Sequence, residues 1–173
     1  MKQPVEIQVC GFHELEEQVQ RHSESVVSIW DVLSPHADET VKFLRRRFRD
    51  DRLHVAKFDD IAIPTPGKRA ATRDDIRKIL LFAKHAPSPV LVHCFAGISR
   101  STAVAYAILC QSHGPGEEDV CMERLLRARP QAAPNAYIVA LADEVLERNG
   151  AMNAAYETVM RRYIIGGAID PEL

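Results

Sequence analysis

The sequence has almost no net charge and no long apolar segment, and each shortage excludes a class of protein. Its 24 acidic and 22 basic residues nearly cancel, so charge gives no reason to expect nucleic acid or an anionic membrane as a partner. The longest apolar run, residues 102–110, is too short to span a bilayer. The opening residues, MKQPVEIQVC, lack the apolar stretch of a signal peptide, so we expect a cytoplasmic protein.

Cysteine is scarce, and no recognisable metal or nucleotide motif is present. The four cysteines, Cys10, Cys94, Cys110 and Cys121, form no CxxC pair, and the histidines show no ligand spacing, so we expect neither a metal nor a cofactor. No GxxxxGK[ST] motif supports a kinase or NTPase. With 46% apolar residues the 173-residue chain can build a core without disulfides, which predicts one domain over residues 1–173. Nothing in the sequence specifies an oligomeric state.

Strand-like and helix-like segments alternate along the chain. Apolar runs predict strands at residues 5–10, 26–30, 53–58 and 90–92. Helices are expected at residues 12–22, 37–48, 72–85, 102–111, 117–128, 134–148 and 152–164. Two prolines and a glycine predict a loop over residues 59–71. This alternation predicts an α/β fold with a central, mostly parallel sheet flanked by helices.

One strand leads into a segment that carries chemistry, His93-Cys94-Phe95-Ala96-Gly97-Ile98-Ser99-Arg100-Ser101. A buried strand, a glycine-containing loop and a helix N-terminus form an anion site, because loop N–H groups converge there and the helix dipole favours negative charge. Cys94, close to these donors and to Arg100, is expected to ionise to a thiolate nucleophile near neutral pH. The guanidinium of Arg100 can contact two phosphate oxygens. A nucleophile beside an anion cradle indicates phosphoryl transfer.

The spacing Cys-x5-Arg is weak by itself, because Cys121 to Arg127 also satisfies it within an expected helix. The Cys94 segment adds a preceding histidine, a glycine three residues later and a serine after the arginine. It resembles the signature loop of cysteine-based protein tyrosine phosphatases, in the HCxAGxSRS form of the dual-specificity branch. Arg129-Pro130 followed by Pro134-Asn135 is similar to the RPxxxPN segment of that branch. The resemblance extends over about residues 26–146.

The resemblance implies a two-step mechanism without metal, in which Cys94 attacks phosphorus and water then hydrolyses the phosphocysteine. Arg100 would stabilise the phosphoryl oxygens, and Ser101 would ease departure of the thiolate besides capping the helix. His93 would orient the loop through hydrogen bonds or serve only in packing. The phosphate would be bound by Arg100 and by the backbone N–H groups of Phe95, Ala96, Gly97, Ile98 and Ser99.

A general acid must protonate the leaving group, and the family carries an aspartate roughly thirty residues before the cysteine. Asp59 and Asp60 both occupy that place, and the alternative is that both begin a solvated turn. Asp60 is slightly favoured, because the following residues 61–64 can pack and hold it over the pocket. Asp31 and Asp38 are interpreted as helix caps or surface acids.

Three further features have a structural interpretation beside a functional one. Asn135 is expected to cap a helix, and the resemblance adds a role in bracing the phosphate loop. Lys68 and Arg69 can contact acidic groups that flank a substrate, or simply face solvent. The arginine-rich residues 45–49 lack interleaved aromatics and are expected to be a solvated helix end. The other three cysteines are expected in the core, and a redox partner for Cys94 among them stays open.

The leading hypothesis is a phosphatase acting on phosphotyrosine, with phosphoserine and phosphothreonine as further substrates. Its partner would be a phosphorylated protein or a small phosphomonoester. A phosphoinositide phosphatase is the rival enzyme, although its loop usually carries lysines, which this loop lacks. A non-catalytic phosphoprotein-binding module is the rival of another class, although such relatives lose the cysteine or arginine that this loop keeps.

Overall fold

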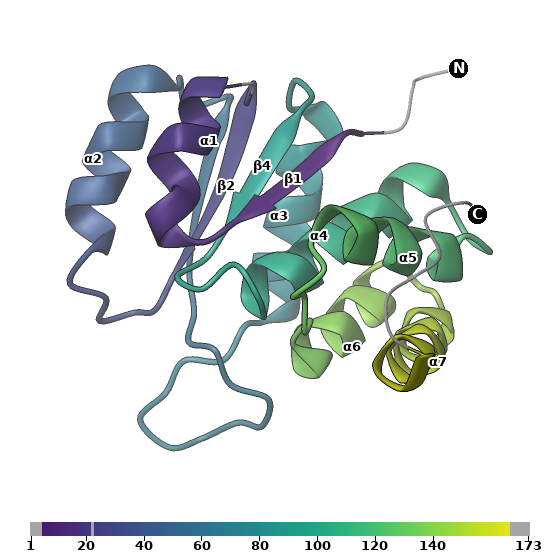
Figure 1. Ribbon diagram of the computed structural model, residues 1–173. Coiled ribbons are helices and arrows are strands. Elements are labelled where there is room, and N and C mark those ends of the chain that lie inside the picture. Colours follow the sequence, from purple (N-terminus) through teal and green to yellow (C-terminus); the bar gives the residue numbers. More distant parts are fainter. Residues whose placement is uncertain (1–4, 22, 167–173) are drawn as a thin grey trace.

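The computed structural model describes residues 5–21 and 23–166, and a four-stranded sheet lies at its centre (Figure 1). The strands are β1 (Ile7–Cys10), β2 (Ser25–Trp30), β3 (Leu53–Lys57) and β4 (Val90–His93), in the order β1-β4-β2-β3. All three neighbouring pairs are parallel. The expected α/β fold with a mostly parallel sheet is confirmed, with small shifts at the strand ends.

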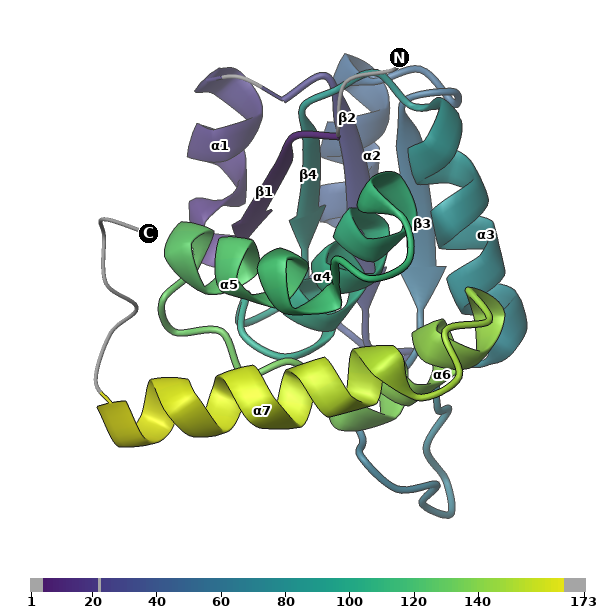
Figure 2. The same cartoon turned by 90° about the vertical axis from the view of Figure 1, so that its right-hand side faces the viewer.

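Helices cover both faces of the sheet, so the central strands β2 and β4 are buried throughout. One face is covered by α1 (Leu15–Arg21) and α2 (Ala37–Arg47), whose Leu15 and Leu44 share a core with Leu91 of β4. The other is covered by α3 (Arg73–His85) and α4 (Arg100–His113). Outside α4 lie α5 (Glu118–Ala128), α6 (Ala136–Val145) and α7 (Ala151–Gly166) (Figure 2). Among the described residues, no helix is long and apolar enough to cross a membrane.

The start of α4 is unusual because it buries polar side chains. The helix begins at Arg100, two residues before its expected start, and every residue as far as Cys110 is buried. Ala103, Ala105 and Ala107 allow β4, α3 and α5 to pack closely around it. Buried polar groups need partners, so the first turn of α4 indicates where the functional contacts lie.

Other helix boundaries follow from their caps. Thr72 caps α3 with Asp75 in a reciprocal capping box, which confirms the expected start. Asn135 caps α6, so the helix begins at Ala136 rather than at residue 134, and it ends before Glu147, which has a φ of 55°. The segment expected as a helix from residue 12 begins as the 3-10 turn η1 (Phe12–Glu14), and its expected last residue, 22, lies outside the described residues.

The carboxyl ends of the four parallel strands meet at one edge of the sheet. The chain leaves β1 at Gly11, β2 at Asp31, β3 at Phe58 and β4 at Cys94. Ligands of parallel α/β sheets bind outside this edge. The topology therefore brings together segments that are far apart in the sequence.

Candidate active site

The loop from Cys94 to Ser99, here called the phosphate loop, joins β4 to α4 and leaves several backbone donors free. Gly97 has a φ of 70° in this loop, and a Cβ there would lie 2.4 Å from the backbone nitrogen of Gly11. Glycine is therefore required by both conformation and space. Within the described structure, no protein acceptor bonds the N–H groups of four loop residues, namely Phe95, Ala96, Ile98 and Ser99. Free N–H groups in such a loop form an anion cradle.

Cys94 lies at the base of this loop, with only 1% of its surface exposed. Its Sγ is 3.1 Å from the hydroxyl of Ser101 and accepts a hydrogen bond from the N–H of Gly97 at 3.3 Å. Ser101 is fully buried in the first turn of α4, so the expectation that it caps the helix is wrong: the N-cap position is occupied by Ser99. The sulfur of Cys94 is thus held between a backbone N–H group and a buried hydroxyl at the base of the phosphate loop.

The guanidinium of Arg100, at the start of α4, is buried, and not all of its N–H groups have an acceptor. It donates to the carbonyl of Phe58 at 2.9 Å and to the Asp31 carboxylate at 3.0 Å. Its buried Nε has no hydrogen-bond partner and lies 3.9 Å from the nearest Asp60 oxygen. A buried charged donor without an acceptor is costly, and a bound anion would satisfy it. The sequence reasoning missed the role of Asp31, although its place directly after β2 puts it at the carboxyl edge.

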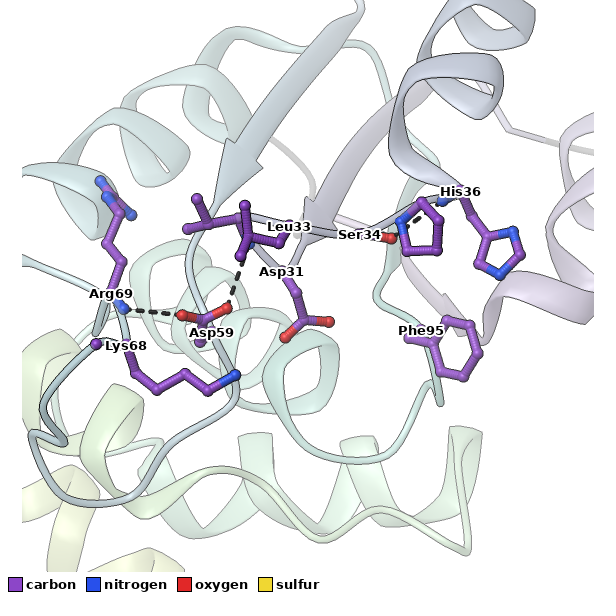
Figure 3. A pocket seen from close by; sticks show the side chains of 11 residues that line it. Asp31, Leu33, Ser34, His36, Asp59, Lys68, Arg69 and Phe95 are labelled. Carbon is purple, nitrogen blue, oxygen red and sulfur yellow. Dashed lines mark hydrogen bonds between the residues drawn. The ribbon is translucent and has the colours of Figure 1, made fainter.

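The two candidate acids face different parts of the structure. Asp59 is 8% exposed, and its carboxylate accepts from the backbone N–H groups of Val32 and Arg69 (Figure 3). The hydrogen bond from Arg69 is the main cause that lowers the pKa of Asp59. Asp60 instead accepts from the Ser99 hydroxyl at 2.8 Å, above the phosphate loop. Asp60 is therefore the carboxylate that the fold places beside the phosphate loop and Arg100, whereas the Asp59 carboxylate joins the segments of Val32 and Arg69.

Asn135 combines the two roles expected for it. Its side-chain oxygen accepts from the N–H groups of Tyr137 and Ile138 and so caps α6. Its amide nitrogen donates to Asp60 at 2.8 Å and to the carbonyl of Ile61, while its backbone N–H donates to the carbonyl of Ser99. One residue thus connects α6, the phosphate loop and the segment that carries the candidate acid.

A buried arginine braces the phosphate loop from its other side. Arg129 donates from Nε to the carbonyl of Gly97 at 3.0 Å and holds Glu14 with both terminal nitrogens, at 2.8 and 2.7 Å. These hydrogen bonds lower the pKa of Glu14. Glu14 also accepts from the N–H of Gly11, which packs against the loop. The sequence analysis did not identify Gly11 and Glu14 as supports of the phosphate loop. The G-x-x-E spacing of a helix capping box was the sequence signal that could have indicated them.

His93 lies beneath the loop in a buried polar network. Its Nε2 is 2.8 Å from the hydroxyl of Ser28, which also accepts from the indole of Trp30. Burial lowers the pKa of His93 to about 4, so the ring is neutral near neutral pH. The hydrogen bond fixes the orientation of a residue that directly precedes Cys94.

The other cysteines lie in the core, as expected. Cys10 ends β1 and packs with Leu91 on the α1 and α2 face, whereas Cys94 packs in the core on the opposite face. Burial raises the pKa of the Cys10 thiol to about 12, so it stays protonated near neutral pH. Cys110 and Cys121 lie within α4 and α5, and all four cysteines are free. Cys10 and Cys94 therefore belong to the cores on opposite faces of the sheet.

No family model and no curated protein matches the sequence, whereas solved structures do match the fold. The Cydia pomonella PTP-2 phosphatase is 21% identical with a TM-score of 0.59, covering 83% of this chain and 90% of that one. Human DUSP28 is 17% identical with a TM-score of 0.56, covering 84% and 94%. PTPMT1 in complex with PI(5)P is 14% identical with a TM-score of 0.56, covering 91% and 94%. The chain has the fold of the protein tyrosine and dual-specificity phosphatases, which confirms the resemblance at the level of the fold.

Proposed function

We propose that the protein is a metal-independent phosphatase that hydrolyses phosphotyrosine in proteins through a phosphocysteine at Cys94. The observation that carries the proposal is one cluster: the sulfur of Cys94, the free N–H groups of the phosphate loop and the unpartnered Nε of Arg100. A phosphoryl group in this cradle satisfies the orphaned donors and lies in line with the nucleophile. The phosphatase fold of the structural relatives supports the same assignment.

In the first step the Cys94 thiolate attacks phosphorus, so that an S–P bond forms while the P–O bond to the leaving group breaks. Asp60 gives its proton to the departing phenolate. In the second step water attacks phosphorus, the S–P bond breaks, and Asp60 takes a proton from that water. Ser101 donates a hydrogen bond to the released thiolate, and inorganic phosphate leaves. Arg100 and the loop N–H groups stabilise the charge on the phosphoryl oxygens in both steps.

A phosphoinositide is the second candidate substrate, because one structural relative was solved in complex with PI(5)P. The phosphate loop has no lysine with which to bind the additional phosphates of a headgroup that carries several of them. Phosphotyrosine is therefore the substrate that the site supports better, with phosphothreonine as the comparison that measures dual specificity.

The test is phosphate release in excess EDTA from matched phosphotyrosine and phosphothreonine peptides and from PI(5)P vesicles. Cys94→Ser is expected to abolish release. The matched control, Cys121→Ser, changes a buried cysteine that has the same Cys-x5-Arg spacing but lies within α5, and it should retain turnover. Release from vesicles alone would establish the lipid substrate. Binding of phosphopeptides without any turnover would instead identify a binding module.

A further inference from the structure

A pocket of about 670 Å³ lies beside the phosphate loop, between residues 31–36, Asp59, residues 67–69 and Phe95 (Figure 3). We call it the side pocket. Neither Cys94 nor Arg100 lines it, but Phe95 directly follows Cys94, and Asp31 binds Arg100. A group in the side pocket is therefore next to a bound phosphoryl group rather than in its place. The volume is typical of sites that bind a ligand.

Most of the charged groups that line the side pocket already have partners. Both oxygens of Asp59 accept backbone hydrogen bonds, and Asp31 pairs with Arg100. The guanidinium of Arg69 binds Asp75 and the carbonyl of Lys57. Among the charged residues around the pocket, Lys68 is the cation without a hydrogen-bonded side-chain partner. The side pocket therefore offers few unpaired charged groups to a ligand.

The free contact surface of the side pocket is apolar. Leu33 is 92% exposed and Phe95 43% exposed, and Val32 and Pro35 lie on the same wall. The ring of Phe95 stacks on that of His36, with the ring centroids 6.0 Å apart. Across the described residues, five of the nine large apolar side chains that are exposed lie on loops at the carboxyl edge: Val32, Leu33, Ile63, Phe95 and Ile98. Exposed apolar side chains that gather in one region of the surface indicate a binding surface.

We propose that the side pocket binds an apolar side chain of the residue next to the phosphorylated residue in a protein substrate. The inference rests on the proposed function and adds sequence preference to it. The occupant is a side chain because the pocket adjoins the phosphate loop, where the phosphorylated residue binds, and offers apolar contacts at Leu33, Pro35 and Phe95. Burial of a leucine side chain there lowers the free energy of the transition state relative to a charged residue.

The experiment measures kcat/KM for phosphotyrosine peptides that carry Leu, Ala, Glu or Lys at each of the two flanking positions. Hydrolysis of para-nitrophenyl phosphate, which has no flanking residue, is measured alongside. At one flank we expect Leu to exceed Glu and Lys by about ten-fold. Leu33→Ser should reduce that preference to about two-fold. The control Leu81→Ser, at another exposed leucine that lies in α3 and does not line the pocket, should leave it unchanged.

Other outcomes overturn the inference in distinguishable ways. Equal kcat/KM across the series, with para-nitrophenyl phosphate hydrolysed, removes the side-pocket assignment and leaves the proposed function intact. A preference for Glu that Lys68→Ala abolishes replaces the apolar assignment with an acidic one. Loss of PI(5)P turnover in Leu33→Ser, with no peptide preference, assigns the pocket to a lipid. Failure to hydrolyse any of these substrates refutes the proposed function itself.

Discussion

The phosphate loop and the loop over residues 59–71, the acid loop, leave the same edge of the sheet but are held very differently. The phosphate loop is fixed by Gly11 behind it, by Arg129 on one side and by Asn135 on the other. The acid loop projects from the body of the protein, and its residues 62–69 are all exposed (Figure 1). Asp59 and Arg69 close its two ends, and Asp60 touches the phosphate loop.

This difference separates two requirements of the proposed chemistry. A cradle for the transition state must be fixed before the substrate arrives, because reorganising dipoles during the reaction costs free energy. The acid loop instead holds Asp60 at its base, through Ser99 and Asn135, and leaves residues 62–69 exposed, where they can adapt to leaving groups of different shape. Matched substitutions in the two loops test whether this division holds.

The largest contrast is expected between Arg100, which follows the phosphate loop as the first residue of α4, and Arg69 of the acid loop. Arg100→Lys should lower kcat/KM by about 10³-fold, because an ammonium cannot replace the planar fork that contacts the phosphoryl oxygens. Arg69→Lys should lower it by less than about three-fold, because Arg69 serves an exposed ion pair with Asp75. Thermal unfolding of both variants excludes misfolding as the cause. Equal losses would contradict the division of roles.

The next contrast uses two glycines with nearly the same backbone conformation, a φ of 70° at Gly97 and 77° at Gly67. Both alanine variants incur about 1 kcal/mol of strain from a positive φ. A Cβ at Gly97 also meets backbone atoms at 2.4 and 2.5 Å, whereas one at Gly67 meets nothing within 4 Å. Gly97→Ala should therefore lose about 3 kcal/mol of stability and about 100-fold in kcat. Urea unfolding and kinetics measure both, and a Gly67→Ala variant that is equally impaired would refute the fixed-cradle interpretation.

Within the acid loop, substitution of Asp60 should reduce catalysis, whereas substitution of Asp59 should reduce stability. Asp60→Asn should lower kcat about 100-fold for a phosphotyrosine peptide and less for para-nitrophenyl phosphate, whose leaving group needs little protonation. Asp59→Asn should instead lose about 1–2 kcal/mol of stability, because it replaces a carboxylate that accepts two backbone hydrogen bonds. Kinetics on both substrates, with urea unfolding, separate the two effects. If Asp59→Asn shows the leaving-group dependence, the assignment of the acid is reversed.

The smallest expected effect is a dependence of stability on pH, caused by His93, which precedes the phosphate loop. Because the pKa of His93 is about 4 in the folded protein and about 6.5 when unfolded, the unfolded state binds more protons between these values. The contribution of neutral His93 to the free energy of unfolding is therefore fully present above about pH 6.5. It decreases as the pH is lowered, by about 2 kcal/mol at pH 5. Urea unfolding between pH 7 and 5 measures this fall. His93→Gln, which keeps a donor for Ser28, should flatten it, and an unchanged slope would show that other groups cause it.

The sequence predicted what is local and missed what depends on distant contacts. The phosphate loop was recognisable because strand, glycine, cysteine and arginine are contiguous, and the parallel sheet followed from the alternation of strands and helices. Glu14 is 115 residues from Arg129 and Asp31 is 69 residues from Arg100, so only the pairing of the strands brings them together. The choice between Asp59 and Asp60 depends on the direction of each side chain, which is set by the backbone donors of Val32 and Arg69.

The central claim is that Cys94 carries the phosphoryl group between the two steps. The most direct test is rapid mixing of the protein with a phosphotyrosine peptide in excess EDTA, an acid quench, and mass spectrometry of the peptide that contains Cys94. Asp60→Asn is included because it slows hydrolysis of the intermediate. The account predicts a phosphoryl group on Cys94 that forms and decays within one turnover. A phosphoryl group on another residue, or undiminished turnover by Cys94→Ser, would contradict it.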